Sequence, residues 1–217
     1  MKPADIHIIL DPGHANFDKQ SGKCSPVLTT NEGWDDATCC NGRFREGMFN
    51  RRITEILTRM LTKLGYNVHN TSPEDGNVSL QTRVRRANDW CKKYGTSNCI
   101  FISIHANAAG NGKQWMSARG VSVHTCHKCS ARSEQMARHI LDTAVHDGFK
   151  GNRSNGFCKN NFYVVKHTLC PAVLVENLFY DNRDDIKILM STEGRAAIAQ
   201  YIFVGLCNFI NEHYKNT

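Results

Sequence analysis

Long hydrophobic runs are absent from this chain of 217 residues. No apolar stretch approaches the roughly 18 residues that a membrane-spanning helix needs, so we expect no membrane span. The N-terminal stretch MKPADIHIIL is also too short and too interrupted for a secretory signal, and it leads directly into an apolar segment. We therefore expect a protein made in the cytoplasm, unless a signal has been trimmed or export uses another route.

The chain also lacks any segment in which lysines and arginines cluster with aromatic residues, as a nucleic-acid surface requires. Its 27 basic and 20 acidic residues leave a net charge of +7. Such a mild bias assists the approach to an anionic polymer, but a solvated basic surface is the simpler interpretation. We expect no nucleic-acid partner.

Cysteine is too sparse for a disulfide scaffold, because ten in 217 residues fall below the roughly 8–10% typical of one. We expect mostly reduced thiols. The one CxxC pair, Cys126 and Cys129, has no second pair at zinc-ribbon spacing. Plain loop thiols are the favoured interpretation, and a structural metal site or a disulfide there stays open. Side chains that would complete such a metal site are Cys158, Cys170, His124 and His127.

Repeats, linkers and low-complexity segments are lacking as well, which indicates one domain over residues 1–217. Apolar segments of strand type alternate with amphipathic segments of helical period, a pattern typical of an α/β fold with a largely parallel or mixed sheet. Strands are expected at 6–10, 66–71, 99–107, 120–125, 162–165 and 172–177, and helices at 46–64, 80–94, 133–148 and 192–210. Residues 15–45 show no periodicity and are predicted to be a long loop or insertion that shapes a cleft.

Three of the predicted strands run into an ionisable residue, which is unusual because an unpaired buried charge is costly. His14 follows ILDPG, His105 lies within SIHAN, and Glu176 lies within LVEN. Glu46 opens the first predicted helix. We expect these residues to converge at one edge of the sheet.

Two histidines and a carboxylate are a common ligand set for catalytic zinc, with the fourth position left for water. A second carboxylate is then needed to take a proton from the water and pass it to a leaving amine. Glu46 and Glu176 can fill these two roles, and spacing alone leaves them interchangeable.

Four separated motifs occur in one order along the chain: ILDPGH, EGMFNRRITEILTRMLTKLGYNV, IFISIHANA and PAVLVENLFYDN. In this respect residues 5–213 resemble the zinc-dependent N-acetylmuramoyl-L-alanine amidases of the Amidase_3 type. The resemblance implies a six-stranded sheet flanked by helices. It implies one zinc ion bound by His14, Glu46 and His105, with Glu176 as the catalytic carboxylate. The implied reaction cleaves the amide between the lactyl group of N-acetylmuramic acid and L-alanine, in peptidoglycan or a muropeptide.

The sequence departs from that family in the long segment between the first two proposed ligands, which carries Cys24, Cys39 and Cys40, and in HTCHKCS. The first departure leaves Glu32 as an alternative to Glu46, and we prefer Glu46 because it begins the family-like helix. The sequence shows no wall-binding repeat, so the chain resembles a phage or prophage endolysin, acting at the cell wall or periplasm as a monomer.

Other residues near the proposed site are candidates for substrate contact. Asn107 and Asn177 adjoin it and offer amides, although Asn is equally suited to turns. Arg86, like Arg83, is a candidate for stem-peptide carboxylates, with a surface ion pair as the simpler interpretation. Two other functions stay open. A zinc exopeptidase of related architecture needs a group that binds a peptide terminus, and a non-catalytic wall-binding module would be expected to lose the ligands or Glu176.

Overall fold

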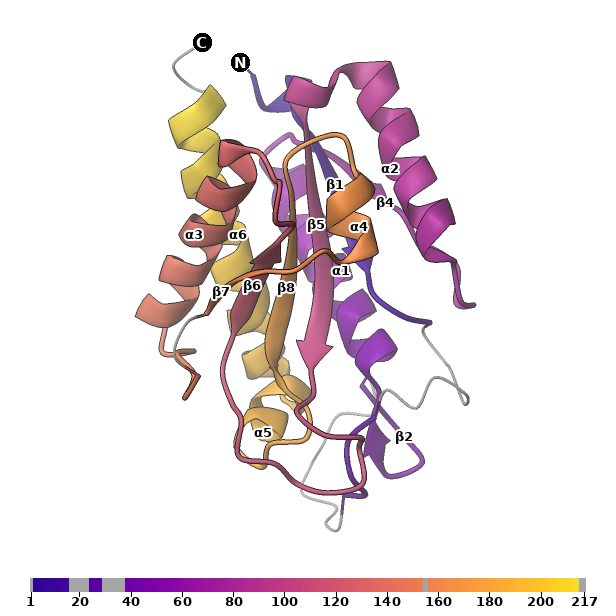
Figure 1. Cartoon of the computed structure of the whole chain (residues 1–217), viewed down its shortest axis with the longest axis vertical. Helices are drawn as coiled ribbons and strands as arrows, with labels where there is room; N and C mark the ends of the chain where they lie inside the picture. Colours follow the sequence, from indigo (N-terminus) through magenta and orange to yellow (C-terminus); the bar gives the residue numbers. More distant parts are fainter. Residues whose placement is uncertain (1, 16–23, 29–37, 154–155, 215–217) are drawn as a thin grey trace.

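The computed structural model describes residues 2–15, 24–28, 38–153 and 156–214 (Figure 1). Its main feature is a six-stranded sheet with strand order β4-β1-β5-β8-β6-β7. The strands are β1 (His7–Pro12), β4 (Asn67–Asn70), β5 (Cys99–Asn107), β6 (Ser122–Thr125), β7 (Phe157–Lys159) and β8 (Ala172–Phe179). All neighbouring pairs are parallel except β6 and β8, which are antiparallel. The predicted α/β class with a mixed, largely parallel sheet is confirmed.

Helices cover both faces of this sheet. They are α1 (Glu46–Lys63), α2 (Leu80–Tyr94), α3 (Ala131–His146), α4 (Tyr163–His167), α5 (Asp185–Met190) and α6 (Thr192–Tyr214), with short 3-10 turns at Pro3–Asp5 and Thr96–Asn98. Figure 1 shows α2 and α4 in front of the sheet, and α1 and α6 behind it. No helix among the described residues is long and apolar enough to cross a membrane.

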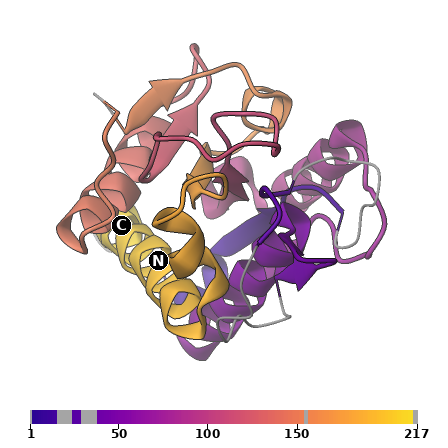
Figure 2. The ribbon, with the colours of Figure 1, turned by 90° about the horizontal axis from the view of Figure 1, so that it is seen from below.

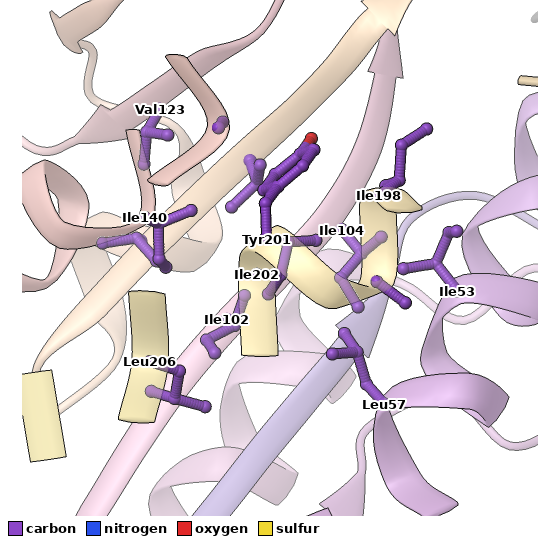
Figure 3. Packing of buried hydrophobic residues seen from close by; sticks show 14 of the residues in the cluster. Ile53, Leu57, Ile102, Ile104, Val123, Ile140, Ile198, Tyr201, Ile202 and Leu206 are labelled. Atoms are coloured by element: carbon purple, nitrogen blue, oxygen red, sulfur yellow. The ribbon is translucent and has the colours of Figure 1, made fainter. Parts of the chain in front are cut away.

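The larger hydrophobic core lies between the sheet and helices α1, α3 and α6 (Figure 3). Every third or fourth residue of α1 enters it, as Ile53, Leu57 and Leu61 show, and all three side chains are fully buried. A smaller core lies under α2 and α4 on the opposite face, where Phe101 and Leu174 of the sheet are buried. Successive side chains of a strand point to opposite faces of the sheet, so the central strands contribute alternate residues to the larger and the smaller core.

Two capping serines explain where the middle helices begin. The Ser79 hydroxyl accepts a hydrogen bond from the backbone N–H of Thr82, and the Ser130 hydroxyl accepts one from Ser133. Such N-caps satisfy one of the otherwise unpaired N–H groups of a first helical turn. Helix α1 ends at Lys63, and two residues later Gly65 has a φ of 86°, which is unfavourable for residues with a side chain.

Residues 162–165, predicted as a strand, are part of a helix, and that prediction is wrong. Lys166 donates its backbone N–H to the carbonyl of Phe162, closing a helical turn. A short apolar run does not distinguish a strand from a buried helical segment, and here the run packs as α4 against the smaller core. The sixth strand is instead β7 (Phe157–Lys159), whose three residues are too few to show a strand pattern.

The described parts of segment 15–45 contain a hairpin that was not predicted. Strands β2 (Cys39–Cys40) and β3 (Arg43–Phe44) pair in antiparallel fashion around Asn41 and Gly42. Both turn residues have positive φ, as tight hairpin turns require, and the Asn-Gly pair is a sequence signal for such a turn. Glu32 and the rest of the predicted loop lie outside the described residues, so its role at a cleft stays a prediction.

A stacked pair of histidines joins β1 to β4 at the edge of the sheet. His7 Nδ1 lies 2.9 Å from His69 Nε2, and their rings stack with those of Tyr94 and Trp90. Burial, with smaller contributions from the charges of His7 and Lys93, lowers the pKa of His69 to about 4. The fold therefore favours the neutral imidazole.

We expect the free energy of unfolding to fall as pH is lowered from about 6.5 to about 4, and His69→Gln to reduce this dependence. In this window the unfolded chain binds a proton at His69 that the folded chain does not, so acid favours unfolding. The measurement is the urea midpoint at about pH 7 and about pH 5. His146→Gln, at an exposed position, is the control. Equal pH slopes in wild type and His69→Gln would contradict the prediction.

Candidate metal centre

The carboxyl ends of three neighbouring strands, β1, β5 and β8, meet at one edge of the sheet, which Figure 2 views from below. His14 follows β1 by two residues, and His105 lies near the end of β5. Glu176 on β8 pairs in register with His105. Glu46, the first residue of α1, completes the group from the side. The topology thus gathers the four ionisable residues that the sequence analysis singled out.

Three of these side chains face one another closely. Glu46 Oε1 lies 3.0 Å from His105 Nδ1 and 3.3 Å from His14 Nε2. One ligand atom of each residue lies within 4.8 Å of the other two, and this is the group of three potential metal ligands found among the described residues. Imidazole nitrogens and a carboxylate oxygen are donors that suit zinc, so the donor set fits that ion.

Charge favours a deprotonated carboxylate at the centre of this group. Glu46 is only 3% exposed, and burial raises the pKa of its carboxyl. The hydrogen bonds from His105 and His14 outweigh burial and hold the pKa of Glu46 below its usual value. For His105 burial lowers the pKa, whereas the hydrogen bond to Glu46 and the charge of Glu176 raise it, with a net increase. A bound dication would take the place of the imidazole proton that the contacts of His105 with Glu46 and Glu176 favour.

The backbone of His14 is fixed from two helices. Its φ of 59° lies in the left-handed region, where residues other than glycine are uncommon. The carbonyl oxygen of His14 accepts hydrogen bonds from Arg51 Nη1 of α1 at 2.8 Å and from Arg83 Nη2 of α2 at 3.1 Å. Arg83 is itself 2% exposed and forms an ion pair with Asp11 at 3.0 Å. These contacts offset the strain at residue 14.

Two glycines allow the ligands to approach so closely. A Cβ added at Gly13 would lie 2.1 Å from the ring of His105, and one added at Gly47 would lie 1.7 Å from the carbonyl oxygen of Ala15. Neither position has room for a side chain unless the backbone or the His105 ring moves. Glycine is therefore required here by space, and it brings the His14 turn against both β5 and the start of α1.

Glu176 lies beside the three-residue group rather than within it. With His14 and His105 it lines a cavity of about 460 Å³, which is also lined by residues 77–80, before and at the start of α2, and by Phe162 and Tyr163. A carboxylate at the wall of such a cavity is suitably placed to exchange protons with a ligand.

The structure places two of the three predicted substrate contacts, Asn177 and Arg86, outside the lining of the cavity beside His14. Asn177 is fully buried; its amide nitrogen donates to the carbonyl oxygen of His105 at 2.7 Å, and its amide oxygen accepts from the Tyr201 hydroxyl. Asn177 therefore fixes the backbone of β5 at His105. Arg86 donates to the Glu74 carboxylate and to the carbonyl of Thr71, and it does not line the cavity beside His14.

Asn107 and the CxxC pair have other surroundings. The side chain of Asn107 accepts a hydrogen bond from the backbone N–H of Ala108 at 2.8 Å, and the residue lines a second cavity. Cys126 is buried, and the Cys129 thiol lies 3.6 Å from a carboxylate oxygen of Glu134. Within the described ranges no third ligand joins Cys126 and Cys129, so the structure offers no support for a second metal site there.

The sequence analysis assigned no role to Asn50 or Arg51, and for Arg83 it weighed stem-peptide carboxylates against an ion pair; in the structure Arg83 is buried and pairs with Asp11. Asn50 donates its amide to the carbonyl of Gly13 at 3.0 Å, so three side chains from two helices hold residues 13 and 14. The sequence contains a signal for such a role at Asn50. This polar residue lies three positions before Ile53 and four before Thr54, so it shares the buried face of the predicted helix with them. Such residues either bind a ligand or support a neighbouring loop.

The family described as N-acetylmuramoyl-L-alanine amidase (Amidase_3) matches residues 8–208. The chain is 26% identical to an endolysin of Bacillus phage SPP1 over 187 residues, which is 85% of this chain and 65% of that protein. It is 28% identical to the N-acetylmuramoyl-L-alanine amidase CwlM of Bacillus licheniformis over 209 residues, 95% of this chain and 69% of that one. The chain thus spans about two thirds of these relatives.

Among solved structures, the amidase Ami1 of Mycobacterium smegmatis superposes with a TM-score of 0.78 over 98% of this chain and 100% of that one, at 22% sequence identity. At that identity the likeness concerns the fold. It covers the sheet and the flanking helices that carry the four ionisable residues.

Proposed function

The chain belongs to the N-acetylmuramoyl-L-alanine amidase family, and from this we propose that it hydrolyses the amide between N-acetylmuramic acid and L-alanine in peptidoglycan, with one zinc ion as cofactor. The observation that carries the proposal is the meeting of His14, Glu46 and His105 with one ligand atom each within 4.8 Å, next to Glu176. Family membership supports the substrate class, and the geometry supports the proposed roles.

In this proposal His14, Glu46 and His105 hold the metal, and Glu176 does not. The division is supported by the direct contacts of Glu46 with both imidazoles and by the place of Glu176 at the cavity wall. Bound zinc supplies Lewis acidity, which polarises a carbonyl oxygen and lowers the pKa of water. Gly13 and Gly47 admit the close approach of the ligands, and Asn177 fixes the backbone of His105.

Glu176 is proposed as the general acid and base. Its carboxylate takes a proton from the attacking water and delivers it to the nitrogen of L-alanine as the carbon–nitrogen bond breaks. The products are a glycan with a free lactyl carboxylate and a peptide with a free amino terminus. We further propose that the protein acts at the cell wall, since its relatives include a protein named as a phage endolysin, and that it is a monomer.

The test is digestion of purified peptidoglycan followed by mass spectrometry of the soluble products. We expect peptides that begin with L-alanine and carry no sugar, together with glycans that carry no peptide. Release of single terminal amino acids would instead indicate a zinc exopeptidase. Binding to the wall with no change in product masses, for a metal-loaded sample, would indicate a non-catalytic module. Either result would contradict the proposed reaction.

A further inference from the structure

A second cavity, of about 360 Å³, lies at β6, the strand next to β8 in the sheet. Ser122 of β6 lines it, and Ser122 is the register partner of Glu176 in the antiparallel β6–β8 pair. Asn107 and Phe179, at the carboxyl ends of β5 and β8, line it as well. Glu176 itself lines the first cavity, with His105 of β5 and residues at the start of α2, and the two cavities share no lining residue.

Positive charge dominates the walls of this second cavity. Arg119, Lys150 and Arg153 line it, against a single carboxylate, Asp142. Arg119 is partly neutralised by Asp184 at 3.8 Å. No described residue forms an ion pair with Arg153, whose guanidinium lies 6.0 Å from the centre of the Phe179 ring and thus toward the carboxyl end of β8.

The basic wall is held together by close backbone contacts. A Cβ at Gly120 would lie 2.1 Å from Gly151 Cα, so these two chain segments touch directly. Asn152 adds two hydrogen bonds across the same contact, accepting from the backbone N–H of Arg119 at 3.0 Å and donating to the carbonyl of Ser117 at 2.8 Å. Residues 119, 150 and 153 are thereby kept on one rim.

The floor of the cavity is polar and neutral. His124 is buried, with its Nε2 2.9 Å from the Ser122 hydroxyl and its Nδ1 2.8 Å from the Asn160 amide. Burial, followed by the charges of His105 and Arg153, lowers the pKa of His124 to about 4. The positive potential at neutral pH therefore comes from the rim, where a ligand can reach it.

We propose that the second cavity binds a carboxylate of the peptide part of the substrate, with Arg153 as the main contact. This inference rests on the proposed amidase function. On the sugar side of the scissile bond the lactyl carboxyl is tied up in the amide, so the sugar is neutral, whereas the stem peptide carries carboxylates. A guanidinium without an acidic partner suits a carboxylate. The first cavity, with Phe162 and Tyr163, is left for the glycan.

The test compares two substrates, N-acetylmuramoyl-L-alanyl-D-glutamate and the same compound with both glutamate carboxyl groups converted to carboxamides. We expect the wild-type KM to be about tenfold lower for the carboxylate, the size of one accessible charge-assisted contact. Arg153→Gln should abolish this preference by raising KM for the carboxylate alone, with kcat unchanged. Lys92→Gln, an exposed change on α2, is the matched control and should behave as wild type.

A binding measurement separates this inference from the amidase reaction itself. Calorimetry with the dipeptide L-alanyl-D-glutamate and its diamide needs no turnover, and we expect tighter binding of the dipeptide that Arg153→Gln removes. If that holds while neither muramoyl compound is cleaved, the cavity assignment stands and the proposed reaction fails. If cleavage occurs but Arg153→Gln changes KM and dipeptide binding equally for charged and neutral ligands, or not at all, the cavity assignment is overturned.

Discussion

Replacing Glu176 with glutamine is expected to lower the turnover of muropeptides by a factor of roughly 10²–10⁴, the usual cost of losing a positioned proton-transfer group. The amide side chain has almost the same shape, so the β8 register with His105 and Ser122 should survive. It cannot accept and return a proton, however. Zinc content should remain at that of the wild type, because Glu176 lies beside the ligand group rather than in it.

Glu46→Gln is the informative comparison, since the same chemical change at this position should weaken zinc binding. Its carboxylate contacts both imidazoles, and a neutral amide oxygen is a poorer donor to a dication. Glu134→Gln, at a surface pair with Lys159, controls for loss of a carboxylate elsewhere. Loss of zinc in Glu176→Gln with retention in Glu46→Gln would exchange the two roles. Full activity of Glu176→Gln would refute the mechanism.

Removing the imidazole of His105 should have the largest effect on the metal. We expect His105→Ala to lower zinc affinity by more than about 100-fold, because changes to outer-shell partners of a ligand alone cost 10–100-fold. Zinc per protein after dialysis, measured by elemental analysis, checks this, with circular dichroism to confirm the fold. Full zinc content in the variant would remove His105 from the ligand set.

Gly13→Ala should reproduce part of this loss without changing any ligand. The added methyl group would lie 2.1 Å from the His105 ring, so that ring must turn away or the His14 turn must shift. Gly76→Ala is the matched control, because nothing lies within 4 Å of a Cβ placed there. Zinc retention in a folded Gly13→Ala protein equal to that in Gly76→Ala would show that the close approach of Gly13 is not needed for the metal.

The central strands and α1 could be predicted because each has a long, unambiguous hydrophobic pattern. Parallel strands end at a common edge, which is why His14, His105 and Glu176 could be expected to meet. The three-residue strand β7 and the five-residue helix α4 carry too little pattern to be told apart. Their assignment depends on packing against segments distant in sequence.

Asn177 and Arg86, two of the predicted substrate contacts, lie away from the first cavity for different reasons. Successive residues of a strand point to opposite faces, so if Glu176 faces the cavity, Asn177 must face the other core. The position of Asn177 was therefore predictable from the sequence. The position of Arg86 was not, because its partner Glu74 comes from the loop after β4, and neither the path of that loop nor the position of the Glu74 carboxylate follows from local pattern.

The clamp on the His14 carbonyl has a consequence for metal uptake. Arg51 and Arg83 fix residue 14 through groups that are not metal ligands, and Asn50 does the same for Gly13. The conformational entropy of this turn is therefore given up when the chain folds and not when the ion binds. Small zinc domains, by contrast, fold only together with their metal. Chelation and reloading of this protein should thus exchange the ion within a folded chain, reversibly, without exposing its core.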